Sequence, residues 1–460
     1  MENKKKYDIK GRKALVVGLG KSGIAATQAL IKLGAEVSVQ DSKKIEEIDP
    51  QLINFLRSRE VKFYFGKDPD ETKRFDFLVL SPGVPSDLEF IKKAKKAGAE
   101  IIGELEIAYR TGRGRYAAIT GTNGKTTTTS LVGEIFEKAG RKTSVVGNIG
   151  VAVISKAINA DDDTWLVTEV SSFQLETVKD FKPEISAVLN LTSDHMDRHG
   201  SMKNYGAAKA KIFMNQDENS YVIINSDDRE CMKLAEKAKA RIVPFSRKKE
   251  LDFGAFVKDG VLTIKDSDGK TAALCAEDEL IIPGQHNVEN ALAAAAMAYF
   301  SGVAPAIISE SLRTFKGVEH RIEFAGEVDG VRFVNDSKGT NPDAAIKAIE
   351  AVKGDIILIA GGYDKGSDFE DFVKAFGTKV KHVILIGKTA VKIKDTAERM
   401  GFTDTIIVKD MDACVQEGMR LAKPGDTVLL SPACASWDMY SNYEQRGKHF
   451  KNCVSRLEKR

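Results

Sequence analysis

The residues with the clearest chemical potential form a glycine-bearing turn, TGTNGKTT at positions 120–127. Residues 117–119 are apolar and predict a strand before the turn, and apolar residues recur at helical spacing from Leu131 to Phe136 after it. Such a turn can bind phosphate, because glycines let backbone N–H groups approach the oxygens and a helix N-terminus carries partial positive charge. We expect Lys125 to reach the outer phosphates and Thr126 to hold Mg²⁺.

The turn departs from the general phosphate-loop pattern at one position. Ile119 stands where G-x-x-x-x-G-K-[ST] has its first glycine, and Gly121 lies nearby. The alternative is a glycine turn with an ordinary surface lysine. The strand-like and helix-like runs on either side favour the phosphate loop.

Two further polar groups follow apolar strands. Glu169 ends the run Trp165-Leu166-Val167-Thr168, and strand ends of a parallel sheet face the ligand crevice. Glu169 is therefore a candidate Mg²⁺ ligand, with capping of the next turn as the alternative. His195 lies in the polar segment 190–197 and could bind a second metal or the substrate. A simple hydrogen bond to a neighbouring acid is an equal alternative for His195.

Lys209 shares a predicted helix face with apolar residues at i−4, i+3 and i+4, namely Tyr205, Ile212 and Phe213. Desolvation on such a face lowers the pKa of a lysine, and a neutral amine can react with carbon dioxide to give a carbamate. The pattern alone favours another interpretation, in which the stem is buried and the ammonium group reaches water.

An earlier glycine turn, GLGKSG at 18–23, follows a strand and fits G-x-G-x-x-G. Asp41 ends the second predicted strand, about where a ribose-binding acid would lie. The pattern is typical of a site for a nucleotide diphosphate and is weak support for NAD. The rigid turn at 81–85, SPGVP, suits the rim of the same crevice.

Polar residues later in the chain have weaker signals. Asn287 and Asn290 lie three apart at the start of an alanine-rich helix and could face a base or ribose, or cap the helix. Arg321 could stabilise phosphoryl charge, or lie solvated in a linker.

These residues need elements that position them, and the sequence predicts three α/β segments. Continuous Val/Ile/Leu runs alternate with helical stretches, which indicates parallel sheets covered on both faces. A smaller β-like patch spans about 253–273. The predicted fold is α/β with three domains at 1–103, 104–317 and 318–460: a Rossmann-like domain, a central phosphate-loop domain with a parallel sheet, and a second Rossmann-like domain.

Composition narrows the class of protein. The 460 residues are 42% hydrophobic and 29% charged, as in soluble globular proteins. The net charge of +3 gives no broad positive field for nucleic acid, and no apolar run reaches the ~20 residues that span a bilayer. The polar start is unlike a signal peptide, and five cysteines without a C-x-x-C pair indicate a reducing compartment. We expect a cytoplasmic monomer without nucleic-acid or membrane partners.

Motifs across the whole chain resemble the Mur ligases of peptidoglycan synthesis. They are TGTNGKTTT at 120–128, EVSSFQLE at 169–176, LTSDHMDRH at 191–199, AAKAKIF at 207–213, GQHNVENALAA at 284–294, HR at 320–321, NDSKGTNP at 335–342 and SPACASWDMYSNYEQRGKHF at 431–450. Within the family the chain is most similar to the D-glutamate-adding member, on GGYDKGSDF at 361–369 and the SPACAS segment. The D-N-P-R tetrapeptide of the diaminopimelate- or lysine-adding member is absent.

The resemblance implies ATP-dependent amide-bond synthesis in cytoplasmic cell-wall precursor assembly. The carboxylate of UDP-N-acetylmuramoyl-L-alanine would attack the γ-phosphate, and the D-glutamate amine would then attack the resulting acyl phosphate. Two Mg²⁺ ions would assist.

The resemblance also assigns roles to residues of this chain. Lys125, His195, Lys209 and Lys338 would be catalytic. ATP would contact Gly121, Thr122, Asn123, Gly124, Lys125, Thr126, Thr127, Asn287, Asn290, Arg321 and Asp336. The UDP substrate would contact Lys21, Ser22, Gly23, Asp41, Ser42, Ser81, Pro82, Gly83, Asn148, Gln174 and His195. D-Glutamate would contact Thr340, Lys365, Ser436 and Tyr443. The metal ligands would be Thr126, Glu169, His195 and a carbamylated Lys209.

Three rival functions remain. A sister Mur ligase would add another amino acid, and a nucleotide sensor would bind ATP without releasing phosphate. An NAD-dependent oxidoreductase would use GLGKSG and Asp41, but it leaves Lys125 and Glu169 unexplained.

Overall fold

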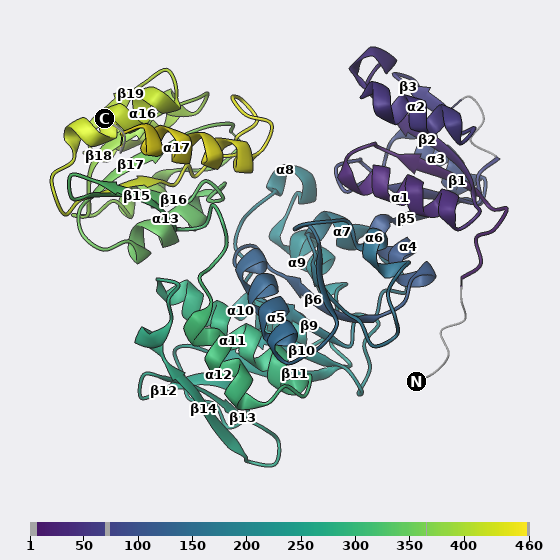
Figure 1. Cartoon of the computed structure of the whole chain (residues 1–460), viewed down its shortest axis with the longest axis horizontal. Helices are drawn as coiled ribbons and strands as arrows, with labels where there is room; N and C mark the ends of the chain where they lie inside the picture. Colours follow the sequence, from purple (N-terminus) through teal and green to yellow (C-terminus); the bar gives the residue numbers. More distant parts are fainter. Residues whose placement is uncertain (1–6, 70–73, 365, 458–460) are drawn as a thin grey trace. The chain divides into compact units, whose positions relative to one another are not determined.

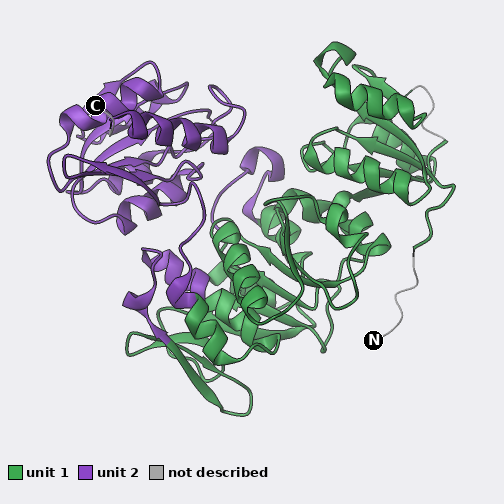
Figure 2. Cartoon of the chain, viewed as in Figure 1, with its two compact units in different colours: residues 1–191, 203–274, 292–311 green, residues 192–202, 275–291, 312–460 purple. Residues whose placement is uncertain are grey.

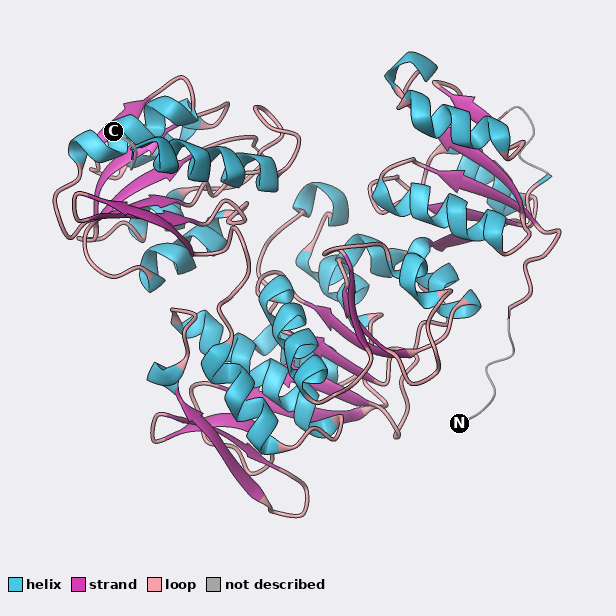
Figure 3. Cartoon of the chain, viewed as in Figure 1, coloured by secondary structure: helices cyan, strands magenta, loops and turns pink. Residues whose placement is uncertain are grey.

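The computed structural model describes residues 7–69, 74–364 and 366–457, which form three sheets flanked by helices (Figures 1 and 3). The described residues fall into two compact units, shown in green and purple in Figure 2. The first unit comprises 1–191, 203–274 and 292–311, and the second comprises 192–202, 275–291 and 312–460. The predicted position Lys365 lies outside the described residues.

The first sheet has the strand order β3-β2-β1-β4-β5, and all its neighbours are parallel. Its elements are β1 (Lys13–Val17), α1 (Lys21–Lys32), β2 (Glu36–Asp41), α2 (Pro50–Ser58), β3 (Lys62–Phe65), β4 (Phe77–Leu80), α3 (Glu89–Lys96) and β5 (Glu100–Gly103). The strand order reverses between β1 and β4, and the carboxyl ends of these strands form the usual ligand crevice of such a sheet.

The second sheet has the order β14-β13-β12-β11-β10-β9-β6-β8-β7. Its strands are β6 (Arg115–Thr120), β7 (Thr143–Gly147), β8 (Trp165–Glu169), β9 (Ile185–Val188), β10 (Tyr221–Asn225), β11 (Arg241–Ser246), β12 (Gly254–Lys258), β13 (Val261–Lys265) and β14 (Thr271–Ala276). Strands β6 to β12 pair in parallel, whereas β12 and β13 are antiparallel. The β-like patch is therefore confirmed: at this edge the otherwise parallel sheet ends in an antiparallel hairpin, because a tight turn reverses the chain between β12 and β13.

Helices accompany this sheet and its connections. They are α4 (Glu104–Thr111), α5 (Lys125–Lys138), α6 (Val153–Ala157), α7 (Ser172–Glu176), α8 (Met196–His199), α9 (Met202–Ala210), α10 (Arg229–Ala235), α11 (Gln285–Phe300) and α12 (Pro305–Thr314). Within the described part of the chain, every helix is too short or too polar to cross a membrane.

The third sheet has the order β15-β16-β20-β17-β18-β19, parallel except for the β15–β16 hairpin. Its elements are β15 (Glu323–Val328), β16 (Val331–Asn335), α13 (Pro342–Ala351), β17 (Ile356–Ala360), α14 (Glu370–Lys374), β18 (Val380–Leu385), α15 (Ala390–Arg399), β19 (Thr405–Ile407), α16 (Met411–Leu421), β20 (Thr427–Leu430) and α17 (Tyr443–Leu457). Leu358 and Ala360 join one apolar core and Ile357 and Ile359 another. Both faces of β17 are thus covered, which explains its uninterrupted apolar sequence.

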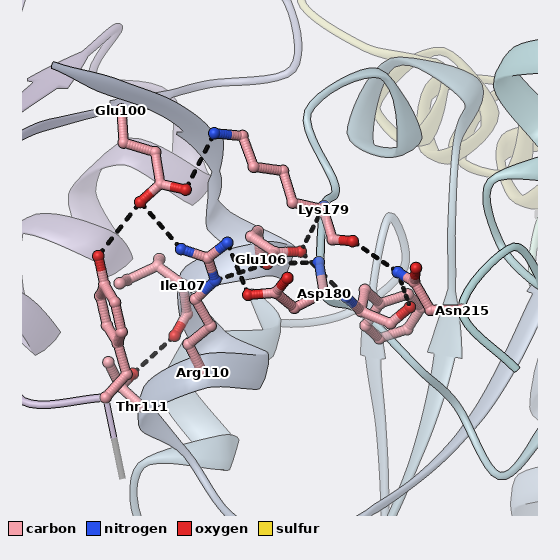
Figure 4. A network of polar contacts seen from close by, with 10 residues as sticks. Glu100, Glu106, Ile107, Arg110, Thr111, Lys179, Asp180 and Asn215 are labelled. Carbon is pink, nitrogen blue, oxygen red and sulfur yellow. Dashed lines mark hydrogen bonds and ion pairs between the residues drawn. The ribbon is translucent and has the colours of Figure 1, made fainter. Parts of the chain in front are cut away.

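A buried charge network ties α4 to the turn before β9 (Figure 4). The fully buried carboxylate of Glu106 accepts backbone N–H bonds from Lys179, Asp180 and Phe181 at 2.9, 2.9 and 3.2 Å. Arg110 donates from Nε to Glu106 at 2.6 Å and pairs through its other nitrogens with Glu100 and Asp180. This network fixes the segment that connects the first sheet to β6 and its phosphate loop.

Candidate active site

The phosphate loop has the predicted geometry: β6 ends at Thr120 and α5 begins at Lys125. Gly121 and Gly124 have φ values of +155° and +83°, which favour glycine. Nζ of Lys125 donates to the carbonyl oxygens of Gly121 and Thr122 at 2.9 and 2.8 Å. The lysine side chain therefore folds back onto the loop whose phosphates it is predicted to bind.

Glu169 lies beside the loop, as the strand pattern predicted. Its Oε2 accepts from the Thr126 hydroxyl at 2.8 Å and its Oε1 from Nδ2 of Asn148 at 2.9 Å. Glu169 is 1% exposed and Thr126 is 3% exposed. A hydroxyl and a carboxylate oxygen at this separation suit a hard cation such as Mg²⁺, so the donor set fits the predicted ion.

Lys209 is fully enclosed, with 1% of its surface exposed. Its Nζ donates to Gly121 O at 2.7 Å and lies 4.4 Å from the ring centre of Tyr205. The pattern-based preference for an ammonium group in water is therefore wrong. The reason is tertiary: the loop carbonyl and the tyrosine ring provide a buried partner that helical spacing alone does not reveal.

Asn190, which sequence reasoning did not single out, holds the loop in place. Its Oδ1 accepts from Asn123 N at 2.8 Å and its Nδ2 donates to Asn123 O at 3.1 Å. Thr122 N donates to Asn190 O at 3.0 Å. The only sequence signal was its place directly after the apolar run Ala187–Leu189, at the crevice end of a strand.

Other predicted residues of this unit lie on the same elements. Thr122, Asn123 and Thr127 are buried in the loop and the first turn of α5. Gln174 is also buried, and its Oε1 accepts from the backbone N and hydroxyl of Ser171 at 2.9 and 3.0 Å.

In the first sheet, Asp41 binds the glycine turn itself. Its Oδ2 accepts from Leu19 N at 2.7 Å and its Oδ1 from Lys43 N at 3.0 Å. The turn after β1 and the end of β2 are thus joined, as a nucleotide site at this crevice requires.

Close packing explains the glycines of this turn. A Cβ on Gly23 would lie 1.8 Å from Gly18 O, and Gly18 itself has φ +84°. The Ser81 hydroxyl donates to Gly18 O at 2.7 Å, which brings the turn after β4 to the same place. The remaining predicted positions here are the exposed Lys21, Ser42 and Gly83 and the partly exposed Ser22 and Pro82.

In the second unit, Asp336 follows β16 and is 1% exposed. Burial raises the pKa of Asp336 to about 6, although the charge of Arg321 and hydrogen bonds counteract this. Its Oδ2 accepts from the Ser431 hydroxyl at 2.8 Å and its Oδ1 from Ile322 N at 3.3 Å. Arg321 is partly buried rather than fully solvated.

The two asparagines of α11 are buried and bonded to each other. Nδ2 of Asn290 donates to Oδ1 of Asn287 at 3.0 Å, and Nδ2 of Asn287 donates to Pro283 O at 2.6 Å. Each asparagine thus makes a hydrogen bond within the protein, in addition to the contact with ATP that is predicted for it.

Lys338 and Tyr443 lie together: Nζ of the lysine is 3.2 Å from the tyrosine hydroxyl. Ser337 donates to Tyr443 O at 2.8 Å. Arg446, a residue that sequence reasoning missed, is 2% exposed and donates to Ser337 O at 2.8 Å and Cys434 O at 3.1 Å. Burial lowers the pKa of Arg446 to about 10. Arg446 thereby joins the turns after β16 and β20.

The other predicted residues of the second unit are His195, Thr340 and Ser436. His195 has φ +55°, and its Nε2 lies 3.6 Å from Oδ2 of Asp194. His195 belongs to the second unit and Lys209 to the first, so the second metal site that they would share stays a prediction. Thr340 is partly exposed and Ser436 is buried.

Comparison with known proteins defines the class. Residues 12–103 match the model of the Mur ligase MurD-like N-terminal domain, 119–298 that of the Mur ligase middle domain, and 320–434 that of the Mur ligase glutamate ligase domain. The chain belongs to the Mur ligase family.

Similar curated proteins share one name. UDP-N-acetylmuramoylalanine--D-glutamate ligase of Thermoanaerobacter sp. (strain X514) is 50% identical over 455 residues, covering 98% of this chain and 100% of the relative. The protein of that name in Clostridioides difficile (strain 630) is 47% identical over 452 residues, with 98% and 100% coverage.

Solved structures support the fold. UDP-N-acetylmuramate-alanine ligase MurC from Thermotoga maritima is 19% identical with a TM-score of 0.59, covering 97% of this chain and 99% of that one. MurF from Acinetobacter baumannii is 16% identical with a TM-score of 0.61, covering 99% and 92%. The chain thus has the three-domain α/β fold of Mur ligases.

Proposed function

We propose that this protein is an ATP-dependent ligase that adds D-glutamate to UDP-N-acetylmuramoyl-L-alanine during peptidoglycan precursor synthesis. The observation that carries the proposal is the arrangement around the phosphate loop, where Lys125, Thr126, Glu169 and Lys209 converge. The full-length relatives support the choice of D-glutamate.

In this proposal the loop binds ATP through its backbone N–H groups and Lys125. Thr126 and Glu169 would hold Mg²⁺, which neutralises phosphate charge. A second Mg²⁺ would be held by His195 and a carbamylated Lys209. The adenosine part would be bound by Asn287, Asn290, Arg321 and Asp336.

The first chemical step transfers the γ-phosphoryl group of ATP to the muramoyl-alanine carboxylate, which gives an acyl phosphate. A carboxylate oxygen of the muramoyl-alanine attacks the γ-phosphorus, the bond to the β,γ-bridging oxygen breaks, and ADP leaves. Lys125 balances the charge that develops on the phosphoryl oxygens. Asn148, Gln174 and His195 would orient the carboxylate, and the turns at 18–23, 41–42 and 81–83 would grip the UDP group.

In the second step the neutral amine of D-glutamate attacks the acyl carbon. The tetrahedral intermediate expels inorganic phosphate, and the amine proton passes to solvent or phosphate. Thr340, Lys365, Ser436 and Tyr443 would hold D-glutamate in attack geometry, and Lys338 would lie near the transferred charge.

We further propose the domain limits 1–103, 104–317 and 318–460, for UDP, ATP and D-glutamate respectively. In the same proposal the protein acts in the cytoplasm, as a monomer, on small-molecule substrates.

The proposal is tested by measuring phosphate release in the presence of ATP, Mg²⁺ and UDP-N-acetylmuramoyl-L-alanine, with each of a panel of amino acids in turn. D-Glutamate should give the highest kcat/KM, and the product should gain one glutamyl unit by mass. A preference for another amino acid would indicate a sister ligase. ATP binding without phosphate release would indicate a sensor, and NAD binding without UDP binding would indicate an oxidoreductase.

A further inference from the structure

Three side chains on α16 and α17 place metal-binding atoms together, outside the residues assigned to the ligase reaction. A carboxylate oxygen of Asp412, a ring nitrogen of His449 and the thiol of Cys453 all lie within 4.8 Å of one another. His449 and Cys453 are four residues apart on α17, so they share one helix face. Cys453 is buried, and the other two are partly exposed.

The imidazole of His449 is already oriented toward this cluster. Its Nδ1 lies 3.0 Å from the Tyr440 hydroxyl, and its Nε2 lies 3.1 Å from Oδ2 of Asp412. Histidines that bind metals usually hold their second nitrogen with such a partner. Without a metal, Nε2 shares its proton with the Asp412 carboxylate; on metal binding that proton can move through solvent to Nδ1, where the Tyr440 hydroxyl accepts it, and Nε2 is left with its lone pair.

A cationic group contacts two members of the cluster, Asp412 and Cys453. Nη2 of Arg456 lies 2.5 Å from Oδ1 of Asp412 and 3.1 Å from Sγ of Cys453. The arginine side chain is 59% exposed, so it can move into solvent with little loss of burial. The space between the Cys453 thiol and the Asp412 carboxylate therefore favours a positively charged group.

We propose that Asp412, His449 and Cys453 form a binding site for a zinc-class divalent ion, which displaces Arg456. One thiolate, one imidazole and one carboxylate are typical zinc ligands, with water in the fourth position. Binding releases the thiol proton to solvent, and Arg456 keeps its charge. Mg²⁺ prefers oxygen ligands only, so this site would discriminate against the ion expected at Thr126 and Glu169.

The required movement is small. Zn–S and Zn–N bonds of about 2.3 and 2.0 Å at a tetrahedral angle place neighbouring donor atoms about 3.5 Å apart. The Nε2–Oδ2 distance is already 3.1 Å. Rotation of the partly exposed Asp412 and His449 side chains can bring the remaining donors to that spacing.

Co²⁺ titration of the full-length, chelator-treated protein tests the site, because a cobalt–thiolate bond gives a near-ultraviolet charge-transfer band. We expect saturation at one equivalent, displacement by Zn²⁺ and no displacement by Mg²⁺. Cys453→Ser should abolish the band, whereas Cys275→Ser, a control at another buried cysteine, should retain it. No thiolate band in the wild type, or equal bands in the two variants, would overturn the proposal.

Arg456 supplies a second, independent measurement. Arg456→Ala removes the competing cation and leaves all three ligands, so Zn²⁺ affinity by calorimetry should rise several-fold. Tyr440→Phe removes the outer hydrogen bond, and affinity should fall about tenfold. Near-ultraviolet circular dichroism checks that each variant is folded. Unchanged affinity in folded Arg456→Ala would contradict the proposed displacement.

Discussion

Replacing Glu106 with alanine should destabilise the first unit strongly, because this buried carboxylate has four partners (Figure 4). Its bonds run to three backbone N–H groups at 2.9–3.2 Å and to Nε of Arg110 at 2.6 Å. Breaking a buried ion pair by removing one partner costs about 3–5 kcal/mol. Glu106→Gln keeps an acceptor but loses the charge, so it should cost about 2 kcal/mol, as for hydrogen bonds to charged groups.

Urea unfolding followed by tryptophan fluorescence measures this cost locally. The chain has two tryptophans, so Trp437→Phe leaves Trp165, on β8 of the first unit, as the only reporter. With a slope of about 2–3 kcal/mol per molar urea, the Glu106→Ala midpoint should fall by about 1–2 M. Glu137→Ala, at an exposed position of α5, should change the free energy of unfolding by no more than about 0.5 kcal/mol.

The three variants should differ in how much free energy of unfolding they lose, and this ranking tests the role of the network. We expect the largest loss for Glu106→Ala, an intermediate loss for Glu106→Gln and almost none for Glu137→Ala. A loss below about 1 kcal/mol for Glu106→Ala would refute the network as an anchor, because three backbone N–H groups and Nε of Arg110 would then tolerate the loss of their shared acceptor.

Three further predictions follow from buried charged groups. Lys209→Ala should abolish phosphate release yet leave calorimetric binding of the UDP substrate nearly unchanged; full activity would remove the carbamate role. Burial raises the pKa of Glu104 to about 7, above its unfolded value of 4.5, so the folded state binds more protons and stability falls as pH rises through this window. Glu104→Gln should flatten that fall, measured by Trp165 unfolding at pH 5 and 7. Arg446→Leu leaves buried carbonyls unpaired and should destabilise the second unit by about 3 kcal/mol, measured by Trp437 fluorescence.

Local patterns predicted the strands and the phosphate loop well. Ile356–Ala360 is apolar throughout because both of its faces are covered, and the structure confirms it as β17. Thr126 and Glu169 could be placed together because Glu169 ends one strand and Thr126 follows its neighbour in one parallel sheet, where carboxyl ends meet at one edge.

Long-range polar contacts had no such signal. In the sequence Glu106 is indistinguishable from an ordinary polar residue of a helix. Its backbone partners lie 73 to 75 positions later in the chain. Asn190 is 67 positions from the loop residue that it holds. A contact between one side chain and a distant turn produces no repeating pattern of apolar and polar residues in the sequence. Such contacts can therefore be identified only in the three-dimensional structure.

The carbonyl of Gly121 gives a physical reason to expect carbamylation of Lys209. Nζ of Lys125 and Nζ of Lys209 lie 2.9 and 2.7 Å from this one oxygen, so the two nitrogens are separated by no more than the sum of these distances. Two ammonium groups that close repel by about 3 kcal/mol at an effective dielectric constant near 20. A carbamate on Lys209 replaces the positive charge with a negative one, and the repulsion from Lys125 becomes an attraction of similar size. The carbamate of Lys209 would then place metal-binding oxygens beside the phosphate loop, where Nζ of the buried lysine now ends.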